Sequence, residues 1–201
     1  FYGGMVKAKS VISMMMMSFG AIALVSVLWV LYGYSMSFGL SDPKTGKITD
    51  WLIPHFLLNP FANVGLSQFI GTGNTSVFGG FSAMAGSNTG DTFSLAFVAF
   101  QATFAIITVA LISGAIADRA KFGAWMVFAG VWATLVYFPV ASWVFNFTVN
   151  PSTGALADGG WSVFGLHVND FAGGTAVHIN AGAAGLALAL VLGKRVGFAK
   201  G

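Results

Sequence analysis

One ionisable side chain lies inside a stretch of sequence that otherwise suits lipid. The stretch DFAGGTAVHIN (170–180) opens with Asp170 and carries His178, and no further ionisable side chain follows until Lys194. Because an ionisable group within a membrane span is costly to bury, it points to function by default. A neutral imidazole offers one donor and one acceptor, so it can pass a proton without holding a charge. His178 is therefore either a pore or relay group, or a neutral histidine whose hydrogen bonds a neighbouring helix satisfies.

Three further residues of this stretch bear on how a helix begins there. Asp170 directly precedes the apolar run, where its carboxylate could accept backbone N–H groups and complement the helix dipole. The alternative role for this carboxylate is to attract a cation at an entrance. Gly173 and Gly174 have no side chain, so another backbone or a permeant molecule could approach closely.

The elements that must hold these residues are long apolar segments. Hydrophobic residues make up 56% of the 201-residue chain and charged residues only 7%, against about 25% charged in a typical soluble domain. Since a bilayer offers the backbone no hydrogen-bond partners, these segments must be helices. The sequence thus predicts an all-α polytopic membrane protein. Its spans are expected at 10–38, 92–117, 122–145 and 171–193.

The charged residues predict which side of the membrane each connection occupies. If the spans alternate in direction, seven cations share one side: Lys7, Lys9, Arg119, Lys121, Lys194, Arg195 and Lys200. By the positive-inside rule that side is cytoplasmic, most simply at the cell membrane. The segments 42–91 and 146–170 are then external loops, and WLIPHFLLNPF within the first is a candidate interfacial helix.

The composition also argues against several functional classes. The chain has no Cys and no Glu, and its basic residues are scattered in ones and twos, so neither a thiolate metal site nor a nucleic-acid patch is expected. No span carries the Lys of a retinal protein or the Arg row of a voltage sensor. An enzyme is not expected, because the spans hold no nucleophile–base pair, and no metal or cofactor is expected.

Five motifs together resemble the ammonium transporter family, in their order and in their spacing relative to the spans. These are FYGG, LWVLYGYSMSFG, FAIITVALISGAIADRAKF, DFAGGTAVHINAGAAGL and GKRVGFAKG. The resemblance implies eleven helices in two inverted five-helix repeats plus a final helix, assembled as a trimer with one pore per subunit. Residues 1–201 resemble the first repeat, so we expect a longer protein whose second repeat supplies a second pore histidine.

The same resemblance assigns roles to individual residues. His178 matches the first of two pore histidines, and Phe104, in the context QATF, matches an aromatic gate at the outer mouth. Asp170 matches an acid near the external recruitment site that acts mainly through structure. Ala172 and Thr175 match positions near the pore entrance.

One recruitment residue departs from the family pattern. The family places a Trp after the third span to hold the cation against its ring face, and Phe145 stands at that position here. Trp161 lies beyond an insertion and is the alternative candidate. Phe is a poorer cation–π partner than Trp, so the outer cation site is left open between the two.

The function implied is transport of ammonium or ammonia through a histidine-lined hydrophobic pore. The alternative is an ammonium-sensing membrane protein with little flux. The resemblance also implies docking of a PII-type regulatory protein on the cytoplasmic face, a homotrimer, and ammonium and the lipid bilayer as the remaining partners.

Overall fold

Four helical stretches dominate the part of the chain that the computed structural model describes, residues 1–38, 92–149, 152–153 and 156–194. The expected external loop 42–91, with its interfacial helix, lies outside these residues. The stretches long and apolar enough to cross a membrane are Ala8–Gly33, Val98–Ile116, Phe122–Phe145 and Gly174–Leu192. The predicted all-α membrane fold is confirmed.

Each helical stretch is built from a few elements in series. The first stretch has η1 (Tyr2–Met5) before the span, η2 (Ala8–Ser10), α1 (Val11–Leu28) and η3 (Trp29–Gly33) within it, and α2 (Tyr34–Phe38) after it. The second contains α6 (Thr92–Ser113) and η4 (Gly114–Ile116). The third contains α7 (Phe122–Trp132), η5 (Ala133–Tyr137) and α8 (Phe138–Phe145), and the fourth contains η7 (Gly174–Ile179) and α9 (Asn180–Leu192).

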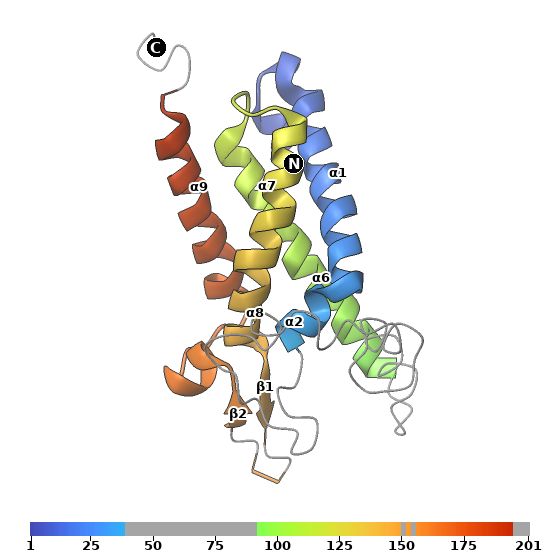
Figure 1. The fold of residues 1–201 in the computed structure, drawn as a ribbon, viewed down its shortest axis with the longest axis vertical. Coiled ribbons are helices and arrows are strands. Elements are labelled where there is room, and N and C mark those ends of the chain that lie inside the picture. Colours follow the sequence, from blue (N-terminus) through green and yellow to red (C-terminus); the bar gives the residue numbers. More distant parts are fainter. Residues whose placement is uncertain (39–91, 150–151, 154–155, 195–201) are drawn as a thin grey trace.

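The helices pack side by side, with α9 at one edge (Figure 1). α1 contacts both α6 and α7, whereas α9 contacts α6. Between them lie large buried side chains, including Trp29, Trp125 and Phe138. The indole of Trp125 donates a 2.9 Å hydrogen bond to the Met17 carbonyl, which joins α7 to α1. A buried indole N–H needs such a partner.

Three of the four spans contain a π-helical turn. η3, η5 and η7 are π-helical turns set in line with α-helix. The hydroxyls of Tyr32 in η3 and Thr134 in η5 lie 2.7 Å apart, so a hydrogen bond joins two of these turns. Pro139 is the second residue of α8, two positions after η5 ends. Since proline lacks an N–H and clashes with the carbonyl four residues back, ordinary α-winding is disfavoured there.

The connection between the third and fourth spans, expected to be a loop, contains regular structure. β1 (Phe147–Val149) pairs antiparallel with β2 (Leu156–Gly159), and η6 (Trp161–Gly165) follows. Gly160 makes this return possible, because a Cβ there would lie 2.2 Å from the Ser142 carbonyl oxygen. The hairpin therefore folds back tightly against the end of α8.

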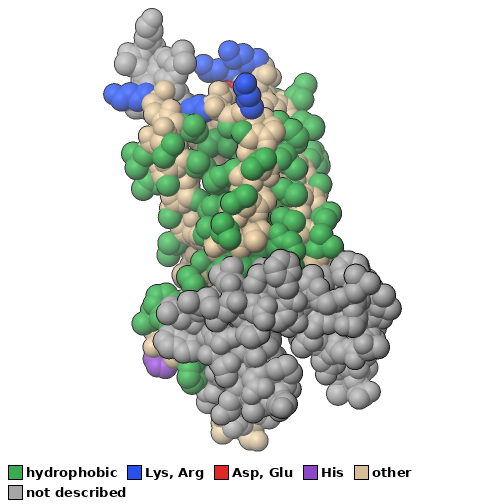
Figure 2. Space-filling view, in the orientation of Figure 1, with side chains coloured by type: hydrophobic (Ala, Val, Ile, Leu, Met, Phe, Trp, Pro, Cys, Tyr) green, Lys and Arg blue, Asp and Glu red, His purple; other side chains and the backbone are tan. Residues whose placement is uncertain are grey.

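The described cations gather at one end of the bundle (Figure 2). The alternating direction of the spans brings the segments before α1, between η4 and α7, and after α9 to this end (Figure 1). Hydrophobic side chains cover the middle of the bundle in the same view (Figure 2). We call the end where the cations gather the basic end. The opposite end holds Asp170 and the hairpin.

Candidate functional site

Asp170 organises the beginning of the fourth span. Its Oδ1 accepts the Gly173 N–H at 2.7 Å, and its Oδ2 accepts the N–H groups of Thr175 and Ala176, each at 2.9 Å. Three backbone donors that a helix start leaves without partners are thereby satisfied. The helix begins at Gly174 and not at the expected residue 171, because Gly173 adopts a left-handed conformation with φ of +84°.

His178 lies in the π turn that opens this span. Its backbone N–H donates a 2.9 Å hydrogen bond to the Gly173 carbonyl. Its side chain is exposed, and the imidazole has no hydrogen-bond partner within the part of the chain that the structure describes. A neighbouring helix among these residues therefore does not satisfy the imidazole.

The helix face that continues from His178 toward the basic end is exposed and apolar over the length of α9. The residues spaced by four along it, Gly182, Leu186 and Leu190, are all exposed, and the fourth span is the least buried of the four. Residues at this spacing share one helix face. The imidazole thus lies at the η7 end of a continuous apolar stripe, defined here as Gly182, Leu186 and Leu190.

Phe104 belongs to an aromatic cluster at the same end as Asp170. Its ring meets Phe100 at a centroid distance of 4.9 Å and Phe145 at 5.9 Å, both in edge-to-face geometry. Such geometry is favourable because the positive edge of one ring faces the negative face of the next. The cluster joins α6 to the end of α8 and lies against the start of the fourth span, where Phe104 Cδ1 approaches Gly173.

The two candidates for the outer cation site lie in different surroundings. Phe145 contacts the Phe104 ring, whereas Trp161 contacts Trp143 at a centroid distance of 5.7 Å, again edge to face. Trp161 begins η6, after the hairpin. The structure therefore brings Phe145, and not Trp161, into ring contact with Phe104.

The remaining predicted residues lie in the segment between Asp170 and His178. Ala172 and Gly174 are exposed, and a Cβ at Gly174 would meet nothing within 4 Å. Thr175 is half-buried and its N–H is held by Asp170. Ala172, Gly174 and Thr175 therefore all lie within two residues of Gly174, where the helix begins.

Two aromatic residues of this region were not predicted from the sequence. Phe100 packs on Phe104, and Trp143 packs on Trp161. A signal for Phe100 was present, because residues four apart on a helix are neighbours. No comparable signal exists for Trp143, whose partner comes from the far side of the hairpin.

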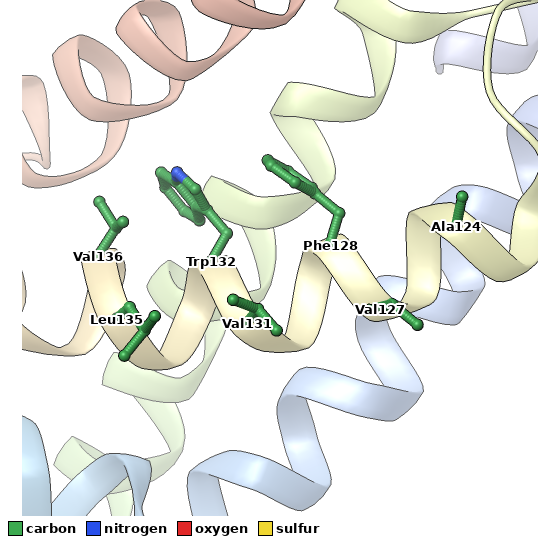
Figure 3. A pocket seen from close by; sticks show the side chains of 7 residues that line it. All are labelled: Ala124, Val127, Phe128, Val131, Trp132, Leu135 and Val136. Carbon is green, nitrogen blue, oxygen red and sulfur yellow. The ribbon is translucent and has the colours of Figure 1, made fainter.

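A wide groove elsewhere on the molecule does not have the chemistry of a cation site. It has a volume of about 560 Å³ and is lined by the seven side chains of α7 and η5 labelled in Figure 3. All seven are apolar apart from the indole nitrogen of Trp132. A cation in such a groove would find almost no hydrogen-bond acceptor.

Comparison with known proteins gives a single consistent result. The family model described as Ammonium Transporter Family matches residues 1–201. An ammonium transporter of Mycobacterium bovis is 53% identical over 201 residues, and one of Bacillus subtilis is 43% identical over 195 residues. These alignments cover 98% and 97% of this chain but only 39% of each relative, so the chain spans about two fifths of their length.

Proposed function

We propose that the full-length protein carries ammonium or ammonia across a membrane, because the chain belongs to the ammonium transporter family. The observation that carries the pore proposal is the His178 imidazole. It is exposed on an apolar helix and has no partner among the described residues. In hydrocarbon such a group would be costly, whereas beside a permeation path it has a use.

Recruitment of the cation is the first step of the proposed mechanism. Asp170 brings negative charge to the end of the bundle opposite the basic end, which is the outer end in this proposal. The described Lys and Arg side chains lie at the basic end. The Phe145 and Phe104 rings lie together at the outer end, and an aromatic ring attracts a cation at its face. We assign Phe104 as the aromatic gate and Phe145 as the recruitment residue on this basis, with Ala172 and Thr175 near the entrance.

Discrimination is the second step, since ammonium and potassium ions have similar charge and size. Ammonium differs because it donates directional hydrogen bonds and can release a proton. Passing neutral ammonia along an apolar path avoids the cost of burying a bare cation. His178 serves as donor or acceptor along that path. The released proton either returns along the imidazoles, which gives net charge movement, or stays outside.

The rest of the protein completes this pore in our proposal. The relatives extend well beyond the aligned region, and a second repeat packed against the apolar stripe below His178 would enclose the imidazole. We also propose a homotrimer in the cell membrane, as the family resemblance implies. The basic end is the surface on which a PII-type regulator would dock.

Substitution of His178 tests the proposal directly. Uptake of radiolabelled methylammonium by the full-length protein in proteoliposomes is expected to lose its selectivity over potassium when His178→Leu is introduced. His167→Asn is the matched control, because His167 is exposed at a φ of 54° that asparagine tolerates. Unchanged selectivity in His178→Leu would remove the pore role. Ligand binding by the parent protein without uptake would instead indicate a sensor.

A further inference from the structure

We infer that Gly173 is a positioning residue that fixes the Phe104 ring against the start of the helix carrying His178. The inference rests on the proposed function, because it concerns the relation between the assigned gate and the assigned pore histidine. Three features of Gly173 support it: the hydrogen bond of its N–H, the hydrogen bonds of its carbonyl, and its close approach to the Phe104 ring.

The backbone N–H and the carbonyl of Gly173 both make hydrogen bonds. Its N–H donates to Asp170 Oδ1 at 2.7 Å. Its carbonyl accepts two N–H groups, from Val177 at 3.0 Å and from His178 at 2.9 Å. The position of the His178 backbone therefore depends directly on the Gly173 carbonyl.

The Cα of Gly173 faces the gate residue. A Cβ built there would lie 3.3 Å from Phe104 Cδ1 and 2.8 Å from Val177 Cγ2. The first distance is tighter than ordinary van der Waals contact, and the second is a clash. Any side chain at this position would therefore displace the Phe104 ring, Val177, or both.

Two aromatic neighbours limit where the Phe104 ring can move. Phe100 and Phe145 contact it at 4.9 and 5.9 Å between centroids. A displacement imposed at Gly173 would therefore open the edge-to-face contacts of the cluster.

Backbone strain and contact must be separated, because an alanine at Gly173 would meet both. Gly193, the other described glycine with a positive φ, is no match, because its ψ is −165° whereas that of Gly173 is 21°. Gly123 has open space around it, so Gly123→Ala adds a methyl group without a contact. The backbone strain of Gly173→Ala does not depend on the side chain at position 104, so a second background separates this strain from the contact.

The test compares Gly173→Ala with Gly123→Ala in the full-length protein reconstituted into proteoliposomes. Initial methylammonium uptake is expected to fall about tenfold for Gly173→Ala, and by less than about twofold for Gly123→Ala, because an added Cβ meets nothing there. Both variants are also made in a Phe104→Leu background. If Gly173 acts through Phe104, Gly173→Ala must cost markedly less uptake in that background, because contacting residues are non-additive.

Several results would overturn the inference. An equal fold-loss for Gly173→Ala in both backgrounds would show that it acts independently of Phe104. Full recovery of uptake in Gly173→Ala/Val177→Ala would show that the closer Val177 contact is the relevant one. The same double variant keeps the test informative if Gly173→Ala alone does not fold.

Failure of the proposed function has a distinct signature, which is absence of uptake by the parent protein. The positioning inference is then judged by electron cryomicroscopy of the Gly173→Ala variant alone. A Phe104 ring that keeps its place beside residue 173 would overturn it.

Discussion

Arg119 Nη1 donates a 2.7 Å hydrogen bond to the Gly193 carbonyl oxygen and thereby joins the ends of the second and fourth spans. Its Nη2 donates to the Ala115 carbonyl in η4. One guanidinium therefore satisfies carbonyls at two helix C-termini, where positive charge also complements the helix dipole. The contact lies at the basic end, at the opposite end of the fourth span from Asp170.

Removing this contact is expected to weaken the packing of α9. Arg119→Gln should lower the free energy of unfolding by about 1–2 kcal/mol, because charge-assisted hydrogen bonds to two carbonyls are lost. The measurement is thermal unfolding of the purified full-length protein in detergent. Lys121→Gln, at an exposed position nearby, is the control and should leave the midpoint unchanged. Equal midpoints for both variants would contradict a structural role for Arg119.

Asp170→Asn tests whether the number of acceptor oxygens matters. An amide has one acceptor oxygen, so it cannot receive all three N–H groups that the two carboxylate oxygens now accept. We expect the free energy of unfolding to fall by about 1–3 kcal/mol. Thermal unfolding measures this, with Asp118→Asn at an exposed left-handed position as the control.

The same variant separates the two roles considered for Asp170. If the carboxylate acted only by attracting cations, Asp170→Asn would unfold like the parent protein. Its loss of methylammonium uptake would then shrink as ionic strength rises, because salt screens exposed charges. A stability loss independent of salt supports the capping role.

Phe145→Trp is expected to strengthen recruitment of the cation. Tryptophan is the best cation–π partner, and a gain of about 0.5–1 kcal/mol would lower the half-saturating methylammonium concentration roughly two- to fivefold. Phe145→Leu should raise that concentration. Initial uptake rates over a range of methylammonium concentrations provide the measurement.

Trp161→Phe is the matched control for this experiment. Trp161 contacts Trp143 and not the Phe104 cluster. The half-saturating methylammonium concentration of the Trp161→Phe variant should therefore stay at the parent value. The opposite pattern, with an effect at Trp161 and none at Phe145, would place the outer site on η6.

Gly33→Ala tests the packing between the first and third spans. A Cβ at Gly33 would lie 2.5–2.9 Å from three ring atoms of Phe138, which is fully buried. Overpacking of this kind costs about 1–3 kcal/mol of stability. Thermal unfolding should detect it, whereas Gly123→Ala, with open space around it, should cause no loss. A Gly33→Ala variant as stable as the parent protein would show that Phe138 can repack.

Much of this fold follows from hydrophobic runs alone. The four spans were predictable because each run is long, apolar and free of charge, and lipid allows only helices there. The hydrogen bonds of Asp170 were predictable for a similar reason, since an acid just before an apolar run is well placed to receive helix N–H groups. Both depend on residues that are close together in the chain.

The features that were not predictable depend on residues far apart in the chain. The π turns η3 and η5 are joined by the Tyr32–Thr134 hydrogen bond between two spans, which no local pattern encodes. The sequence does not show that Gly173, and not Gly174, adopts the left-handed conformation. The contact between Phe104 and Phe145 joins two different helices, and no sequence pattern predicts it.

A π turn holds one residue more than the α-helical turn it replaces. Deleting a single residue from Ala133–Tyr137 would therefore restore an ordinary turn and leave α7 and α8 facing their present neighbours. The same deletion within α7 would rotate everything beyond it by about 100° and turn its buried side toward lipid. Insertions and deletions within the spans of related proteins are thus expected to gather at these turns, where the chain can change length without changing which faces meet.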